Sequence, residues 1–171
     1  MRVNDRARRA VHDDLDADEQ VAAILPLNIH LGGSSTDLSS GSSVLGSPYA
    51  EARGIDLDDP KLRADLLTIW CTVTGRRLLF HEPKQTSVRP TPGKLVDEVP
   101  LEATTLAWYD SSGAGTRHRV VHLTFPDGRH LLSGTLVKAP LRRKTYNDEA
   151  ELFVRAFGER AAEVPLSLIH I

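Results

Sequence analysis

From residue 66 to residue 137 the chain alternates between short apolar runs and short polar turns, a pattern typical of β-hairpins. The runs are rich in β-branched and aromatic residues, and three turns between them, TGR, SSGAG and PDG, contain glycine. Glycine in a short turn between two apolar runs favours a hairpin. We therefore predict six strands in this part of the chain, at residues 66–73, 77–82, 94–101, 104–110, 117–125 and 129–137.

Helical periodicity marks the two ends of the chain. Residues 4–14 have apolar positions at roughly helical spacing, and residues 147–163 have a clearer stripe. In the second segment the apolar positions recur three and four residues apart, so we expect them to face the core together: Leu152, Phe153, Ala156 and Phe157. Asn147 or Asp148 is the expected N-cap.

Three segments depart from these regular patterns. The apolar run 21–31 contains Pro26, which predicts a strand at a sheet edge or with a bulge, because proline donates no ladder hydrogen bond. Residues 32–60 are rich in Gly and Ser and then in turn formers, so we expect a flexible insertion. Residues 83–93 contain three prolines and are predicted to be loop.

Together these elements predict an α+β fold that is mainly β. We expect about seven strands to form a small, strongly bent antiparallel sheet, with the C-terminal helix over one open end. A short N-terminal helix precedes the sheet.

Several short motifs follow the same order as the predicted elements: ADEQV (17–21), TVTGRRLLF (72–80), DEVPLEATTLAWYD (97–110), VVHLTFPDGRHLL (120–132) and FVRAF (153–157). In these motifs the chain resembles the bacterial PH-like domains, the pleckstrin-homology superfold close to the GRAM type. The resemblance implies a bent sheet or partial barrel with a helix over one end. It also implies binding of lipid headgroups, peptides or proteins, without catalysis. We expect residues 17–163 to form this domain and residues 1–16 to form an N-terminal helical arm.

The composition narrows the class of protein. The 171 residues suit one domain, and 21 Lys and Arg against 23 Asp and Glu give no global case for nucleic-acid binding. No apolar run is long enough to span a membrane, and no apolar signal segment follows the first basic residues. The only cysteine, Cys71, excludes an internal disulfide, so we expect a cytoplasmic location.

Six basic residues are the candidates for binding an anion. Arg76 and Arg77 stand where a predicted strand begins, and the segment KAPLRRK adds Lys138, Arg142, Arg143 and Lys144. In one interpretation they contact an anionic group, and such a cluster attracts acidic lipid by about 1 kcal/mol per charge near a membrane. In the other, an arginine stem covers a sheet edge and the loop charges are solvated.

The seven histidines raise the question of a metal site. His118 and His122 share one face of the predicted strand 117–125. If the PDG turn pairs Phe125 with His130, then His130 points to the other face and three ligands do not converge. We therefore predict neither a metal site nor a cofactor, although one extra residue in the turn would reverse the face of His130.

No motif predicts catalysis. Cys71 lies in an apolar strand and is expected to be a small buried side chain, with His81 as a weak candidate for approaching it. The serines and glycines of residues 32–46 match no hydrolase, phosphate or dinucleotide motif. Trp108 and Tyr109 are adjacent and must face opposite sides of their strand, so one is expected in the core, and the other, if exposed, marks a contact surface.

The sequence thus predicts a non-catalytic binding or interaction module with a protein or peptide ligand. The alternative is a peripheral membrane domain, on the inner face of the membrane, whose basic loops bind acidic lipid headgroups. A small hydrolase or metal enzyme is a third hypothesis that no motif supports. No nucleic-acid partner and no transmembrane segment are expected.

The last six residues, LSLIHI, differ in character from the helix before them. An apolar tail can add a strand to the sheet edge of a neighbour, and this one is too short to span a membrane. The codons CTG-TCT-CTT-ATA-CAC-ATC would encode the same residues, and that string looks like the transposase adapter used in sequencing libraries. We therefore expect residues 164–171 to be a non-native tail, which removes His170 from the candidate ligands.

Overall fold

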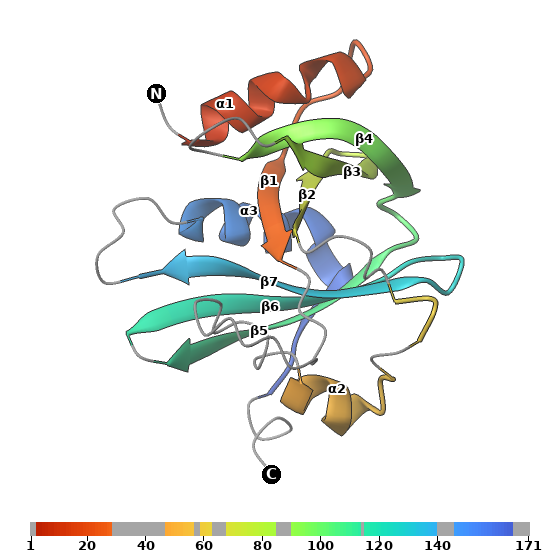
Figure 1. Ribbon diagram of the computed structural model, residues 1–171. Helices are drawn as coiled ribbons and strands as arrows, with labels where there is room; N and C mark the ends of the chain where they lie inside the picture. The colour runs from red at the N-terminus through yellow and green to blue at the C-terminus, as the bar shows by residue number, and fades with distance from the viewer. Residues whose placement is uncertain are drawn as a thin grey trace.

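A computed structural model describes residues 3–28, 47–56, 59–62, 68–84, 90–113, 115–139 and 146–165. The strands are β1 (Ala23–Asn28), β2 (Thr68–Val73), β3 (Arg77–Lys84), β4 (Thr91–Pro100), β5 (Thr105–Gly113), β6 (Thr116–Thr124), β7 (His130–Lys138) and β8 (Ala161–Glu163). The helices are α1 (Val3–Ala10), α2 (Ser47–Arg53) and α3 (Asn147–Phe157), with 3₁₀ turns at His12–Asp14 and Gly158–Arg160 (Figure 1). The predicted α+β fold, mainly β with a helix at each end, is confirmed.

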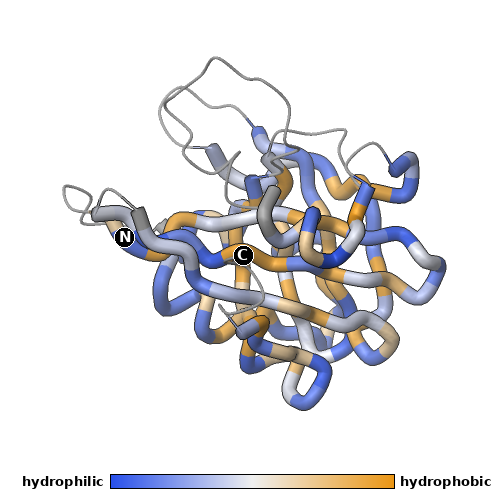
Figure 2. Tube along the Cα trace, turned by 90° about the horizontal axis from the view of Figure 1, so that it is seen from below, coloured by the Kyte–Doolittle hydropathy of each residue, from blue (hydrophilic) through white to orange (hydrophobic). Residues whose placement is uncertain are grey.

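The eight strands form one sheet in the order β4-β3-β2-β1-β7-β6-β5-β8, and it is not closed. The two halves of this sheet face each other across one core, because alternate residues of both halves join the same buried cluster: Leu25, Leu27, Ile69, Leu78, Phe80, Val121, Leu123 and Leu131. Phe153 and Phe157 of α3 complete the cluster. Figure 2 shows the hydropathy along the chain, with hydrophobic positions in the strands and hydrophilic positions in the turns.

Each half of the sheet also has an outer face that a helix covers. Ala7 of α1 packs with Ile24 and Trp70 on the outer face of β1 and β2. At the other end of the molecule, Tyr49 of α2 packs against Tyr109 and neighbouring apolar residues of β5 to β7 (Figure 1). Buried apolar area of this kind is the main stabilising term, at roughly 25 cal/mol per Å².

The position of Pro26 in β1 has a physical explanation. The described part of β7 pairs with β1 only at Asn28 and Gly134, so most of that side of β1 is open. The Ile24 N–H points to the open side and donates to the Glu149 carboxylate of α3 at 2.9 Å. Strand alternation places the nitrogen of Pro26 on the same side, where no ladder bond is lost. The predicted edge strand or bulge at Pro26 is therefore wrong, because β1 lies between β2 and β7 and pairs with β2 without a register shift; proline is tolerated because the described part of β7 leaves this side of β1 largely unpaired.

Two segments that were predicted to be loop contain regular structure. Helix α2 lies within residues 32–60, and its Tyr49 and Ala50 are buried; residues 29–46, 57 and 58 lie outside the described ranges. The predicted loop 83–93 is entered from both ends by strands, since Pro83 of β3 pairs with Pro92 of β4. Two register shifts accompany this pairing, and bulges are the sites where a sheet tolerates proline.

The C-terminal helix is shorter than predicted. It ends at Phe157 because Gly158, with a φ of +55°, leaves the helical conformation. Residues Ala161–Glu163 then add to β5 as the parallel strand β8, and Val164 is buried beside it. Leu152 is 40% exposed, so its predicted place in the core is wrong, while Phe153 and Phe157 are buried as predicted. Residues 166–171 lie outside the described part of the chain.

Candidate functional site

Arg76 and Arg77 occupy the tight turn between β2 and β3. The Thr74 hydroxyl accepts the N–H groups of Arg76 and Arg77 and lies 2.6 Å from a Glu19 oxygen, to which it can donate its proton. The Thr74 N–H donates to the Arg77 carbonyl and closes the turn. The hairpin predicted from the TGR sequence is therefore confirmed, and it holds both arginines at one end of the sheet.

Arg77 is fully engaged within the protein. Its Nε and Nη2 atoms donate to the Glu19 carboxylate at 2.8 to 3.2 Å, and its Nη1 donates to Glu98 at 2.5 Å. The Glu19 side chain is only 1% exposed. The hydrogen bond from Arg77 is the main reason that the pKa of Glu19 falls from its ordinary 4.5 to about 2, and the same bond raises the pKa of Arg77. Arg77 is thus the counter-ion of a buried carboxylate.

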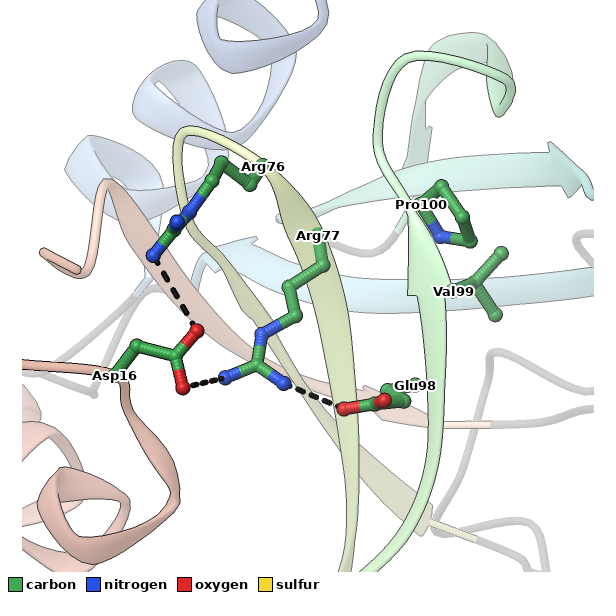
Figure 3. A pocket seen from close by; sticks show the side chains of 6 residues that line it. All are labelled: Asp16, Arg76, Arg77, Glu98, Val99 and Pro100. Carbon is green, nitrogen blue, oxygen red and sulfur yellow. Dashed lines mark hydrogen bonds and ion pairs between the residues drawn. The ribbon is translucent and has the colours of Figure 1, made fainter.

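Arg76 lies at the surface, where its side chain is 54% exposed. Its Nη2 contacts Asp18 at 2.9 Å and Asp16 at 3.4 Å. A cleft of about 280 Å³ opens beside the two arginines, as Figure 3 shows, and is lined by Asp16, Arg76, Arg77, Glu98, Val99 and Pro100. We take this cleft, the Arg76–Arg77 cleft, as the candidate functional site.

The charge of the Arg76–Arg77 cleft differs from what the sequence suggests. Its two guanidinium groups contact four carboxylates, those of Asp16, Asp18, Glu19 and Glu98. Four negative charges against two positive charges leave an excess of two negative charges. Three of these carboxylates are largely exposed, so they can meet a ligand, whereas Glu19 is buried. Such a site repels an anion and attracts a cation.

The other basic candidates are not part of this cleft. Lys138 is exposed at the end of β7, which lies across the molecule from the end of β4 (Figure 1). Arg142, Arg143 and Lys144 lie outside the described residues. Arg117 of β6 pairs in register with Lys138, and sequence spacing alone could not show that these two cations are neighbours.

The predicted face of His130 is wrong. Thr124, not Phe125, pairs with His130, so His130 shares a face with His122. The His122 Nε2 atom lies 3.2 Å from His130 Nδ1, Tyr49 contacts the other nitrogen of His122, and Asp59 contacts the other nitrogen of His130. These four side chains form a line of hydrogen bonds. Within the described residues, no set of three or more His, Cys, Asp and Glu side chains is placed to hold a metal ion.

The remaining sequence candidates are structural in this molecule. Cys71 is buried in the core as predicted, and the register pairs it with Phe80, so His81 faces the opposite side of the sheet. The His81 Nε2 atom lies 3.1 Å from an Asp14 carboxylate oxygen, and burial lowers the pKa of His81. Trp108 and Tyr109 do face opposite sides: Tyr109 is buried under α2, and Trp108 is partly buried under the Arg119 guanidinium, so neither forms an exposed aromatic contact surface.

We expect Arg77→Ala to lower the free energy of unfolding by about 2 kcal/mol, because it leaves Glu19 buried without its counter-ion. Arg76→Ala, the matched surface variant, should cost less than about 0.5 kcal/mol. The measurement is urea unfolding followed by circular dichroism. Equal effects of the two substitutions would contradict the difference in burial.

The pH dependence of Arg77→Ala gives a second readout. The pKa of Glu19 is lower in the folded state, so its contribution is present above about pH 4.5 and is lost as the pH falls toward 2. The native chain should therefore lose stability over this window. Arg77→Ala should lose less stability over the same window, because the main cause of the lowered pKa is absent.

None of the helices in the described ranges is long and apolar enough to cross a bilayer. A scan against protein-family models finds no match for the chain, and a search of curated proteins finds no similar sequence.

Proposed function

We propose that the chain is a non-catalytic binding module of the PH-like type, and that its ligand is a segment of protein or peptide. The bent sheet with α3 against its core is compatible with this fold family. Ligand recognition at the Arg76–Arg77 cleft would use a positively charged side chain of the peptide. One observation is the basis of this proposal: three exposed carboxylates contact the two arginines, Asp16 and Glu98 in the lining of the cleft and Asp18 beside it, so they outnumber the charges that the arginines supply.

Within the cleft, Arg76 and Arg77 would have different roles. A lysine or arginine of the ligand can replace Arg76, which lies at the surface and contacts only exposed carboxylates. It would not displace Arg77, because that would leave Glu19 buried and unpaired. The apolar side of Val99 and the ring of Pro100 would contact the aliphatic stem of the ligand side chain, as such stems favour apolar surface.

The outer edge of β4 is a poor alternative for a peptide that adds a strand. Its pairing with β3 is broken by two register shifts, and it contains Pro92 and Pro100. Bulges and prolines are the features that prevent an edge strand from pairing with another chain. We therefore place recognition in side-chain contacts at the cleft rather than in main-chain pairing at β4.

A second candidate function, binding of acidic lipid headgroups, is favoured by a different surface. Lys138 and Arg117 lie side by side at one end of β7 and β6, and the chain continues from there into the basic residues 142–144. Each such cation contributes about 1 kcal/mol near an anionic membrane surface. This surface is separate from the Arg76–Arg77 cleft, so the two functions can be tested independently.

We expect a fluorescein-labelled peptide of alternating Lys and Gly to bind the full chain with an affinity that falls as salt is added. The double variant Asp16→Asn with Glu98→Gln should weaken binding by about three- to tenfold, since each exposed ion pair contributes about 0.2–1 kcal/mol. Fluorescence anisotropy measures the affinity. Asp148→Asn removes an exposed carboxylate elsewhere and should leave the affinity unchanged.

Co-sedimentation with phosphatidylcholine vesicles, with and without phosphatidylserine, tests the other candidate. Pelleting only with phosphatidylserine, reduced by Lys138→Ala and unchanged by the cleft variant, would support lipid binding. Peptide binding that is insensitive to Asp16→Asn with Glu98→Gln would overturn the proposed role of the cleft.

A further inference from the structure

Four side chains that are distant in sequence form one line of hydrogen bonds on the outer face of β6 and β7. The Tyr49 hydroxyl lies 3.0 Å from His122 Nδ1, and His122 Nε2 lies 3.2 Å from His130 Nδ1. His130 Nε2 lies 3.2 Å from an oxygen of Asp59. The line joins α2 and residues 59–62 to the sheet, and no sequence motif places these residues together.

The hydrogens of this line can be assigned consistently when both rings are neutral. Tyr49 donates to His122, His122 donates to His130, and His130 donates to the Asp59 carboxylate, so each ring donates once and accepts once. One added proton can also be accommodated on His130 if the Tyr49–His122 and His122–His130 hydrogens reverse, because His130 then donates from both nitrogens and keeps the Asp59 carboxylate as its counter-ion. A second proton cannot, since it places two N–H groups and two positive charges face to face at 3.2 Å.

This line holds a covering segment that consists of residues 47–56 and 59–62, which we call the α2 strap. Beneath it lie the apolar residues Tyr109, Val120 and Leu132, which are buried. Tyr49 is part of the apolar cover, with its ring 5.7 Å from that of Tyr109 and 5.6 Å from that of His122. Besides these side-chain contacts, the backbone N–H of His130 donates to the backbone carbonyl of Lys61 at 3.2 Å.

We propose that the α2 strap is a pH-sensitive cover, which stays on the outer face of β5 to β7 while His122 and His130 share at most one proton and is released when both rings are protonated. Release would expose the apolar surface around Tyr109, Val120 and Leu132. The occupant of that surface at neutral pH is the strap itself.

The surroundings of His122 also disfavour its protonation while the strap is docked. Burial, the charge of His130 and that of Arg53 lower the pKa of His122 to about 4, so this ring takes the second proton. Arg53 also stacks on the Tyr49 ring at 5.7 Å. The titratable and charged groups that face the line from α2, residues 59–62 and the sheet are Tyr49, Arg53, Asp59, Lys61, Tyr109 and His118.

The size of the effect follows from linkage. In the released strap His122 returns to its ordinary pKa of 6.5, so the released state takes up the proton more readily at acidic pH. The contribution of protonation to opening is therefore negligible near pH 7.5 and grows as the pH falls below 6.5. From a pKa of about 4 in the docked state, we expect opening to increase roughly thirtyfold between about pH 7.5 and about pH 5.

Amide hydrogen exchange of the full chain, corrected for the intrinsic effect of pH, tests the proposal. The amide of Ile55, which donates to the Ala50 carbonyl, should lose protection roughly thirtyfold between about pH 7.5 and about pH 5. The amide of Cys71 in β2 should keep its protection. In the docked state the nitrogen shifts of the His122 ring should titrate near pH 4, below the pH at which the protection of Ile55 begins to fall.

Three variants separate the two rings from other sources of pH dependence. His122→Gln should abolish the pH dependence of Ile55 exchange. The control His12→Gln alters a histidine in the turn that follows α1, whose side chain is 83% exposed, and should retain the pH dependence. If His122→Gln releases the strap at every pH, then Tyr49→Phe decides: it keeps both rings and should show the thirtyfold dependence from a lower baseline. Protection of Ile55 that is constant to within threefold in the native chain, or a dependence that persists in His122→Gln, would overturn the proposal.

Discussion

Glu149→Ala is expected to lower the free energy of unfolding by about 3–4 kcal/mol, because its carboxylate joins three separate parts of the chain. The side chain is only 6% exposed. It accepts hydrogen bonds from Arg8 at 3.0 and 3.1 Å, from Asn4 at 3.0 Å and from the Ile24 N–H at 2.9 Å. Alanine would leave the N–H of Ile24 buried without a partner and would remove the hydrogen bonds from Asn4 and Arg8 of α1 to Glu149 of α3.

Asp148→Ala is the matched control for Glu149→Ala. Asp148 lies in the same first turn of α3 but is exposed, so its loss removes only a favourable interaction with the helix dipole, about 0.3–1 kcal/mol. Glu149→Gln should fall between the two, since an amide oxygen can still accept from Ile24. Urea unfolding followed by tryptophan fluorescence measures all three. If Glu149→Ala and Asp148→Ala cost the same, the contacts of Glu149 contribute nothing beyond the dipole.

The hairpins of this fold could be predicted from the sequence because each depends on neighbouring residues. The turn at Gly75 and the apolar runs beside it determine β2 and β3 within about a dozen residues. The hydrogen bonds of the Glu149 carboxylate could not be predicted, because their donors lie 125 to 145 positions earlier in the chain. Strand β8 was missed for a related reason: three residues pair with β5 only after α3 has placed them there.

The register of the β6–β7 hairpin shows how one residue type can reverse a prediction about a site. In a two-residue turn at Asp127 and Gly128, Pro126 would have to donate an N–H to Arg129, and proline has none. The Gly128 N–H instead donates to the Phe125 carbonyl, and Gly128 has a φ of +82°. This type I turn with a glycine bulge adds one residue, so His130 faces His122. The signal was present in the sequence as Pro-Asp-Gly.

The two arginines that line the Arg76–Arg77 cleft could be singled out from the sequence, but the charge around them could not be predicted. The carboxylates that neutralise the arginines come from a loop about 60 residues earlier and from β4. Local sequence therefore identifies a basic pair, whereas the folded chain presents an acidic cleft. The difference decides which class of ligand the proposal names.

Arg119→Met is expected to cost about 3 kcal/mol, because Arg119 is a buried cation held by several partners. Its side chain is 3% exposed, and its Nε and Nη2 donate to the two Asp110 oxygens at 2.8 and 3.0 Å. Nη2 also lies 2.8 Å from Glu151 of α3, and the guanidinium stacks over the Trp108 ring at 4.3 Å. Methionine keeps the apolar stem but leaves Asp110 without its bidentate partner.

A double variant separates the net contribution of the Arg119–Asp110 ion pair to stability from the penalty of leaving one partner unpaired. Removing both charges, in Arg119→Met with Asp110→Leu, should restore stability to within about 1 kcal/mol of the native chain, since a buried pair is often replaceable by apolar residues. The Nη1 atom of Arg119 supports this expectation, because it is buried without a hydrogen-bond partner among the described residues. A double-mutant cycle in urea measures the coupling. If the double variant is as unstable as Arg119→Met, the stacking of Arg119 on Trp108 and its contact with Glu151, rather than the pairing with Asp110, hold α3 to the sheet.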